Sequence, residues 1–270
     1  MIKKYIVSLS ITATMLLVSG CDFSNEYDKV ESVNLKAPDK IEVECNIDNN
    51  DLVLFTFGQS NAANSVNEYA NAINENLIEI HDGKCYIMND PLLGTNGDGG
   101  TVWTNLGNIL LENKSSNKVY FINTAIGGSA ISSWIPGGDN NHLLVDKMKM
   151  ANDMGVDIDM FLWHQGETDA ILSTPAETYY DNFMLIHDEI ILAHPYSKIL
   201  VARASKCGDI SSPFIINTQN NLISNNYNIY SGPYTDVLGN SYRYDGCHFN
   251  GLGAKYHAAL WYDDIKKLLN

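Results

Sequence analysis

Basic residues are scarce in this sequence. Its 270 residues include 17 Lys and Arg against 32 Asp and Glu, which gives a formal net charge of −15 at pH 7. No basic run, no basic amphipathic helix and no internal repeat is present. A surface of this charge repels the phosphates of nucleic acids and anionic lipid headgroups, so we expect no nucleic-acid partner.

Zinc-binding spacings are missing as well. The sequence has 5 cysteines but no C-x-x-C pair and no Cys/His zinc spacing, so we expect no metal. Apart from Cys21, which lies in the N-terminal region, the cysteines are Cys45, Cys85, Cys207 and Cys247. We predict the pairs Cys45–Cys85 and Cys207–Cys247, because each lies near the ends of predicted strands; free thiols are the alternative.

The longest apolar run near the N-terminus is too short for a comfortable transmembrane helix. Tyr5–Val18 follows Lys3 and Lys4, an order typical of a secretory leader. Val18-Ser19-Gly20-Cys21 then resembles the lipobox of bacterial lipoproteins, in which the cysteine becomes the lipidated first residue. The alternative is an ordinary signal peptide with an incidental cysteine.

These features predict the organisation of the chain. Residues 1–20 are expected to be a signal peptide, residues 21–40 a tether lipidated at Cys21, and residues 41–270 one catalytic domain. The expected location is the cell envelope, where an exported lipoprotein is anchored to a membrane on its periplasmic or cell-surface side. Export would place the remaining cysteines in an oxidising compartment.

From Ile41 onward, short apolar runs alternate with longer segments of helical spacing. Hydrophobic residues make up 45% and charged residues 18% of the sequence, which is ordinary for a globular protein. The alternation predicts an α/β three-layer sandwich, with a mainly parallel sheet between helices. The predicted strands are Leu52–Phe57, Val119–Asn123, Ile158–Trp163 and Lys198–Ala202. The predicted helices are Asn61–Asn74, Trp103–Glu112, His142–Met154, Ala176–Ala193, Phe214–Ser224 and Gly253–Leu269.

Polar and glycine residues cluster just past the predicted strands, where parallel sheets carry their sites. Gly58-Gln59-Ser60-Asn61 places a serine at a strand-to-helix turn, where it is either a nucleophile or a plain helix cap. We expect the helix start there to add a positive dipole end. Gly127 and Gly128 follow another strand and allow close approach of a backbone N–H, or simply form a turn.

Two further polar blocks complete the pattern. Trp163–Asp169 contains an amide that can donate to an oxyanion and a carboxylate that can orient or bind. Its histidine, His164, is either a base or a structural residue. Asp245 and His248 are three positions apart in a loop, so the carboxylate can hold one ring nitrogen and leave the other for a serine.

Together these blocks resemble the signatures of the SGNH hydrolase superfamily, most closely those of its sialate O-acetylesterase and acetylxylan esterase branch. In that branch the blocks read G-Q-S-N, H-Q-G-E and D-G-x-H-F, and this chain has all three in the same order. The resemblance extends from about residue 51 to residue 265. It implies the flavodoxin-like fold of SGNH hydrolases.

The resemblance also implies roles. Ser60 matches the nucleophile, His248 the general base and Asp245 the residue that orients the base. The Ser60 N–H, the Gly128 N–H and the Gln165 side chain match the oxyanion hole. The wider superfamily has Asn where Gln165 falls, so this last assignment is confined to the branch.

The implied reaction needs no cofactor and forms an acyl-enzyme on serine. Glu167 is a rival orienter of the histidine, and Glu167 and Asn61 are also possible substrate contacts. Trp134, Trp163 and the tyrosines around Tyr230 either stack on a sugar or belong to the core.

The implied substrate is an O-acetylated carbohydrate, with O-acetylated sialic acid as the main expectation. Acetylated xylan or another polysaccharide is the alternative within the same chemistry. A lipid-anchored glycan-binding protein without catalysis is the alternative from another class, and a metal-dependent deacetylase is a further one.

Overall fold

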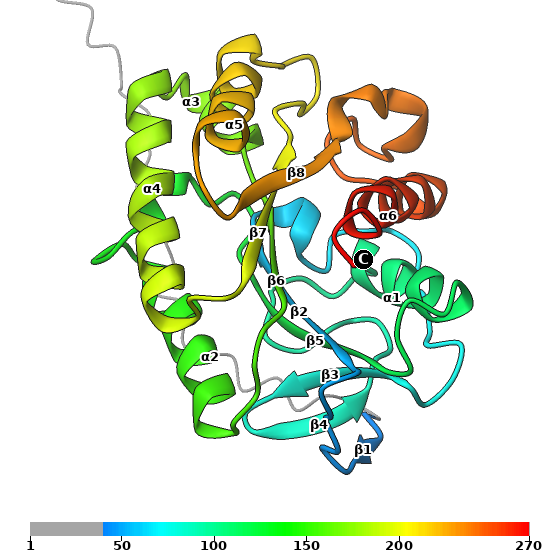
Figure 1. The fold of residues 1–270 in the computed structure, drawn as a ribbon. Coiled ribbons are helices and arrows are strands. Elements are labelled where there is room, and N and C mark those ends of the chain that lie inside the picture. The colour runs from blue at the N-terminus through cyan, green and yellow to red at the C-terminus, as the bar shows by residue number, and fades with distance from the viewer. Residues whose placement is uncertain (1–39, 270) are drawn as a thin grey trace, which may run out of the picture. The chain divides into compact units, whose positions relative to one another are not determined.

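An eight-stranded sheet forms the centre of the computed structural model, which describes residues 40–269 (Figure 1). The predicted leader, the lipidation site at Cys21 and nearly all of the tether lie outside the described residues. The strands are β1 Glu42–Val43, β2 Leu52–Gly58, β3 Leu77–His81, β4 Lys84–Ile87, β5 Val119–Ala125, β6 Met160–His164, β7 Lys198–Arg203 and β8 Ile229–Tyr234. Their order in the sheet is β1-β4-β3-β5-β2-β6-β7-β8.

Most of the sheet is parallel. Strands β3, β5, β2, β6, β7 and β8 run in the same direction, whereas β4 and β1 form an antiparallel edge. After the edge strand β1, the chain enters the middle of the sheet with β2, builds one side through β3, β4 and β5, and then crosses to β6 on the other side. The crevice at such a change of side, beyond the carboxyl ends of the strands, is where parallel α/β proteins bind ligands.

Helices cover both faces of the sheet and confirm the predicted three-layer architecture (Figure 1). Helices α1 and α6 pack on one face, and α2, α4 and α5 pack on the other. Among residues 40–269, no helix is both long enough and apolar enough to span a membrane. The helices are α1 Val102–Glu112, α2 Asn141–Asp153, α3 Glu167–Leu172, α4 Ala176–Ala193, α5 Pro213–Asn225 and α6 Gly251–Ile265.

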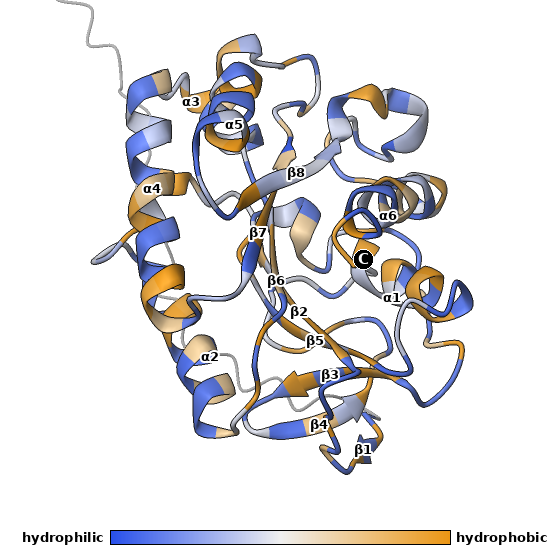
Figure 2. Cartoon of the chain, in the orientation of Figure 1, coloured by the Kyte–Doolittle hydropathy of each residue, from blue (hydrophilic) through white to orange (hydrophobic). Residues whose placement is uncertain are grey.

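Strand β2 shows how the sequence builds both layers. Successive side chains of a strand point to opposite faces. Accordingly, Val53, Phe55 and Phe57 enter the core beneath α2, α4 and α5, whereas Leu52 and Leu54 enter the core beneath α1 and α6. Figure 2 shows the resulting hydrophobic colouring of the central strands.

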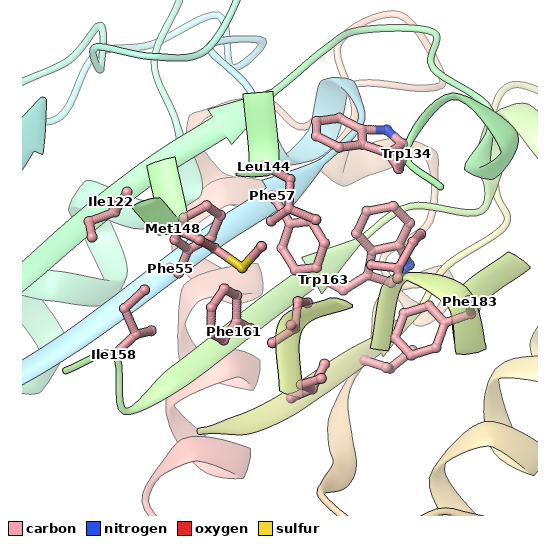
Figure 3. Close-up of a cluster of buried hydrophobic side chains, with 14 of the residues drawn as sticks. Phe55, Phe57, Ile122, Trp134, Leu144, Met148, Ile158, Phe161, Trp163 and Phe183 are labelled. Atoms are coloured by element: carbon pink, nitrogen blue, oxygen red, sulfur yellow. The ribbon is translucent and has the colours of Figure 1, made fainter. Parts of the chain in front are cut away.

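A group of aromatic side chains forms the core beneath α2 and α4 (Figure 3). The Phe57 and Trp163 rings lie 4.6 Å apart between centroids, and the Trp163 and Trp134 rings lie 6.0 Å apart. Both tryptophans are 0% exposed. They therefore belong to the core. The alternative prediction, that they stack on a sugar, is wrong for these two residues.

The predicted helix over residues 61–74 is wrong. Only a single 3₁₀ turn, Ser60–Ala62, follows β2. Beyond it, the Asn64 side chain hydrogen-bonds both the N–H and the C=O of Leu92, and Val66 pairs with Gly100 through two backbone hydrogen bonds. Because partners distant in the sequence satisfy these groups, the segment forms bends and turns in place of an α-helix. The dipole expected from a helix after Ser60 is therefore absent.

The other predicted elements are present with shifted ends. The four predicted strands correspond to β2, β5, β6 and β7, and the remaining predicted helices correspond to α1, α2, α4, α5 and α6. Strands β1, β3, β4 and β8 and the short helix α3 are additions that the apolar pattern did not reveal. Both predicted disulfides are confirmed: Cys45 is bonded to Cys85, and Cys207 to Cys247.

Candidate active site

Ser60 stands directly beyond the carboxyl end of the central strand β2. The chain turns there at Gly58, which has a φ of 135°. A methyl group on Gly58 would lie 2.1 Å from the carbonyl oxygen of His164, so glycine is required where β2 and β6 end side by side. The Gln59 N–H then donates to the same His164 carbonyl at 3.0 Å. This contact fixes the turn that carries the serine.

The Ser60 side chain is buried but has no hydrogen-bond partner within the described residues. Ser60 is 7% exposed. Within residues 40–269, neither its hydroxyl nor its backbone N–H makes a hydrogen bond. A buried serine hydroxyl usually has a partner. Its freedom here fits a group that must meet a substrate and a base.

His248 and Asp245 form a close pair in the loop before α6. His248 Nδ1 lies 2.6 Å from Asp245 Oδ2, and Asp245 Oδ1 accepts the backbone N–H groups of Cys247 and His248 at 2.9 and 2.7 Å. Burial pushes the pKa of Asp245 upward, but the hydrogen bonds from the His248 ring and from the two backbone groups outweigh it, so the net pKa is lowered. An ionised carboxylate accepts the proton of Nδ1, which leaves Nε2 as the acceptor for a hydroxyl.

The loop that carries His248 is tied to the turn that carries Ser60 by the residue next to each. The Asn61 Nδ2 atom, one residue after the serine, donates to the Cys247 carbonyl oxygen at 3.3 Å. The buried Arg243 side chain donates to that same oxygen and to the Leu238 carbonyl at 3.0 Å. The Cys207–Cys247 disulfide anchors the loop to the segment after β7. Sequence reasoning missed Arg243, because it lies just before the recognised D-G-x-H-F block.

Glu167 faces a different histidine. Its Oε1 atom lies 2.9 Å from His164 Nε2 and accepts from Asn61 Nδ2 at 2.7 Å. Burial raises its pKa, but the charge of His164 and the hydrogen bonds from His164 and Asn61 prevail and lower the pKa to about 2. Of the two rival orienters, Asp245 is therefore the one in contact with His248. Asn61 acts as a brace between two blocks.

His164 is wholly buried, and both of its ring nitrogens have neighbours. Its Nδ1 atom lies 3.2 Å from His257 Nε2, which also accepts the indole N–H of Trp261 at 2.9 Å. Burial is the main reason why the pKa of His257 is well below its usual value. Because Glu167 occupies the other side of His164, this ring has no free face for a substrate. The structural interpretation of His164 fits the structure better than that of a base.

Two backbone N–H groups remain candidates for the oxyanion site that the sequence predicts. The Gly128 N–H, like that of Ser60, donates to no residue within 40–269, and Gly128 is exposed with a φ of 70°. The preceding N–H, that of Gly127, donates to Asn96 Oδ1 at 2.9 Å. A pair of free N–H groups next to a nucleophile is the usual arrangement for holding the charge of a tetrahedral intermediate.

The Gln165 amide is engaged elsewhere. Gln165 is 0% exposed, and its Nε2 donates to the Ser129 carbonyl at 3.2 Å and to the carboxylate of Asp169. Asp169 also accepts the Ile131 N–H at 2.8 Å and the Thr174 hydroxyl at 2.6 Å. Asp169 thus joins the glycine loop to the H-Q-G-E block. The sequence placed Asp169 in this block but assigned it no role.

Exposed tyrosines remain at the surface as candidates for sugar contact. Tyr244 is 49% exposed, and its ring is stacked on that of His248 with centroids 6.0 Å apart. Tyr227 and Tyr234 are also exposed, whereas Tyr230 is partly buried against the core. Within the described part of the chain, no three or more His, Cys, Asp or Glu side chains are grouped to hold a metal ion.

Solved structures share this fold at low sequence identity. A protein from Arabidopsis thaliana aligns over 82% of this chain and 97% of its own length, with a TM-score of 0.61 and 17% identity. A carbohydrate acetylesterase from Xanthomonas citri aligns over 80% of this chain and 56% of its own, with a TM-score of 0.59 and 15% identity. NanS aligns over 81% and 96%, with a TM-score of 0.56 and 14% identity. The fold is that of SGNH-type hydrolases.

Sequence comparison gives the family. Residues 95–251, more than half of the chain, match the family described as carbohydrate esterase, sialic acid-specific acetylesterase. No curated protein matches the sequence. The matched segment contains Gly128, Gln165, Asp245 and His248, while Ser60 precedes it. The chain belongs to this family of carbohydrate esterases.

Proposed function

We propose that the chain is a serine esterase that removes acetyl groups from an O-acetylated carbohydrate through an acyl-enzyme. Ser60 is the nucleophile, His248 the general base and Asp245 the residue that orients the base. The observation that carries the proposal is the 2.6 Å contact between His248 Nδ1 and Asp245 Oδ2. It occurs in a loop that Asn61, the neighbour of Ser60, holds at the nucleophile turn.

The reaction follows from these positions. Ser60 Oγ attacks the acetyl carbonyl carbon while His248 Nε2 takes the hydroxyl proton, and Asp245 stabilises the imidazolium through Nδ1. The Ser60 and Gly128 N–H groups hold the oxyanion. The intermediate then breaks its bond to the sugar oxygen, which receives the proton from His248. Water, activated by the same histidine, hydrolyses the acetyl-enzyme and releases acetate.

The substrate that we propose is O-acetylated sialic acid. The family description supports it, because the matched family is described as specific for that sugar acid. Acetylated xylan or another polysaccharide would use the same serine chemistry with a different sugar surface. Exposed Tyr244, stacked on His248, lies where the sugar would enter in either case.

The experiment is acetate release from O-acetylated sialic acid and from acetylated xylan, measured side by side. The variant Ser60→Ala removes the nucleophile, and Ser241→Ala is the matched control at an exposed serine. Both mechanism and substrate are supported if the wild type and Ser241→Ala release acetate from O-acetylated sialic acid but not from xylan, and Ser60→Ala releases none. Release from xylan only keeps the mechanism and replaces the substrate. Equal release by Ser60→Ala overturns the mechanism.

We also propose that the chain is exported and lipidated at Cys21. Small residues before this cysteine and the short apolar segment behind Lys3 and Lys4 support this. Metabolic labelling with a palmitate analogue in a bacterial host tests it. The wild type should carry the label in the membrane fraction, and Cys21→Ala should not. Equal labelling of both proteins contradicts the anchor.

A further inference from the structure

The inferred oxyanion site lacks the side-chain donor that the sequence assigned to it. Gln165 Nε2 is committed to the Ser129 carbonyl and to Asp169, and the residue is wholly buried. Turning the amide toward Ser60 would leave the Asp169 carboxylate short of a donor in the core, which is costly. If a side chain donates to the oxyanion, another residue is better placed to do so.

Asn96 lies in the loop between β4 and α1, and its backbone is fixed on both sides. Its N–H donates to the Ala125 carbonyl at 3.1 Å, at the end of β5. Its carbonyl accepts the N–H of Asn64 at 3.0 Å, in the segment that follows the nucleophile turn. The residue is therefore held between two of the segments that make the site.

The orientation of the Asn96 side chain is also fixed. Its Oδ1 accepts the Gly127 N–H at 2.9 Å, and an N–H group requires the oxygen, not the nitrogen, of an amide as its partner. The Nδ2 group must then point the other way. Within residues 40–269 it makes no hydrogen bond, and Asn96 is exposed to solvent.

The unpaired Nδ2 group of Asn96 lies near Ser60. A methyl group placed on Gly127 would lie 3.5 Å from Asn96 Nδ2 and 3.6 Å from Ser60 Cβ, so the two side chains flank the same point. The next residue along the chain is Gly128, whose N–H is free. Three donors without a partner in residues 40–269 thus come from Ser60 and its surroundings: the Ser60 N–H, Asn96 Nδ2 and the N–H of Gly128, which follows the glycine in contact with both side chains.

We propose that Asn96 is a further catalytic residue, which donates its Nδ2 hydrogen to the oxyanion formed when Ser60 attacks the acetyl group. This inference rests on the proposed function of Ser60. The bond from Gly127 holds the amide in place before the substrate arrives. A donor that is oriented in advance stabilises a developing charge without reorganising.

Two substitutions isolate the Nδ2 donor. Asn96→Asp keeps an oxygen for the Gly127 N–H but loses the donor and adds a negative charge. Asn96→Ala loses the donor and the bond to Gly127 but adds no charge. The loss of the donor is the defect that both share. Asp98→Asn, an exposed change in the same loop, is the control.

The measurements are kcat and KM for p-nitrophenyl acetate, and the rate at which a fluorophosphonate modifies Ser60. Thermal unfolding accompanies them to establish that each variant is folded. We expect both Asn96 variants to lower kcat and the phosphonylation rate on the order of 10²–10³-fold, with KM nearly unchanged. Asp98→Asn should match the wild type.

The contrary outcomes are separable. If either Asn96 variant is folded and keeps kcat and phosphonylation within about threefold of the wild type, the inference is overturned, because an oxyanion donor is typically worth far more. If only Asn96→Asp loses activity, the inference is likewise overturned, because the added negative charge then explains the loss. If the wild type itself shows neither serine-dependent turnover nor labelling, the proposed function fails and takes the inference with it.

Discussion

Asp245 Oδ2 lies 2.6 Å from His248 Nδ1, within a loop that presents two backbone N–H groups to the other oxygen of the same carboxylate. The carboxylate therefore fixes the ring and the loop together. Replacing it changes the tautomer of the base, whereas the loop retains its disulfide and its contact with Arg243. This relationship allows the role of Asp245 to be tested separately from folding.

We predict that Asp245→Asn lowers kcat for an acetyl ester on the order of 10²–10⁴-fold, because general-base catalysis depends on Nε2 being free of its proton. Steady-state kinetics with p-nitrophenyl acetate measures this. Asp209→Asn, a change at an exposed aspartate outside the site, should behave as the wild type. Retained kcat in a folded Asp245→Asn variant would reject Asp245 as the orienter.

Glu167→Gln should act mainly on stability. Removing one partner of the buried pair with His164 should lower the free energy of unfolding by about 3 kcal/mol at pH 7. The pKa of Glu167 is lowered from 4.5 to about 2 in the folded chain, so the stability it contributes is present above pH 4.5 and is lost as the pH falls toward 2.

Urea unfolding of the wild type and Glu167→Gln across this range provides the measurement. The difference between the two proteins should shrink as the solution is acidified. A difference that stays constant from pH 7 to pH 3 would show that Glu167 is not held ionised in the folded chain.

Asp90 should have the opposite pH dependence. Its carboxylate accepts the N–H groups of Ala70 and Thr101 and the hydroxyl of Thr104, yet burial prevails and raises its pKa from 3.8 to about 6. A raised pKa means that the stability linked to this group is full below pH 3.8 and is lost as the pH rises through about 6.

As the pH rises from 4 to 7, the free energy of unfolding of Asp90→Asn should therefore increase relative to that of the wild type. The increase should be roughly 2–3 kcal/mol for a pKa shift of this size. Thermal unfolding at both pH values tests this, with the exposed Asp98→Asn as the control. If the stability of Asp90→Asn relative to the wild type falls as the pH rises, the assigned direction of the shift is wrong.

The two disulfides form a matched pair, because each joins cysteines 40 positions apart. Removing either by double Cys→Ala substitution should cost a similar amount of stability, about 2–4 kcal/mol. Only Cys207–Cys247 lies next to His248. Its removal should also lower kcat on the order of 10–10²-fold through misplacement of the base, whereas loss of Cys45–Cys85 should leave kcat unchanged.

Denaturant unfolding and steady-state kinetics on the two double variants test this contrast. If both variants are folded and have the same kcat, the Cys207–Cys247 bond contributes to stability alone. A drop in kcat after loss of Cys45–Cys85 would mean that the edge of the sheet influences the site, which the account does not predict.

The sequence predicted the centre of the fold because the central strands are nearly pure apolar runs. Leu52–Gly58 is buried at every position. In a chain of alternating strands and helices, such a short apolar run is typical of a central parallel strand. Two strands that the apolar pattern missed lack this signature: the interior strand β3 carries Glu79, and the edge strand β8 contains Gly232 and Pro233. Their place is set by neighbouring strands, which no local pattern reveals.

The site was predictable as a set of blocks but not as a set of contacts. Motif order brought together Ser60, Gln165 and His248. Whether Asp245 or Glu167 faces His248 depends on the path of the loop, which the structure supplies. Asn96 lies in a glycine-rich loop without periodicity, and only its contacts in the folded chain, above all the hydrogen bond from Gly127, distinguish it from any exposed asparagine.

The most direct test of the account is fluorophosphonate labelling of the intact protein, followed by peptide mapping with mass spectrometry. We predict one adduct on Ser60, no adduct in Ser60→Ala, and a rate reduced on the order of 10²-fold or more in His248→Ala. An unlabelled wild type, or an adduct on another residue that persists in Ser60→Ala, would contradict the assignment of Ser60 as the nucleophile.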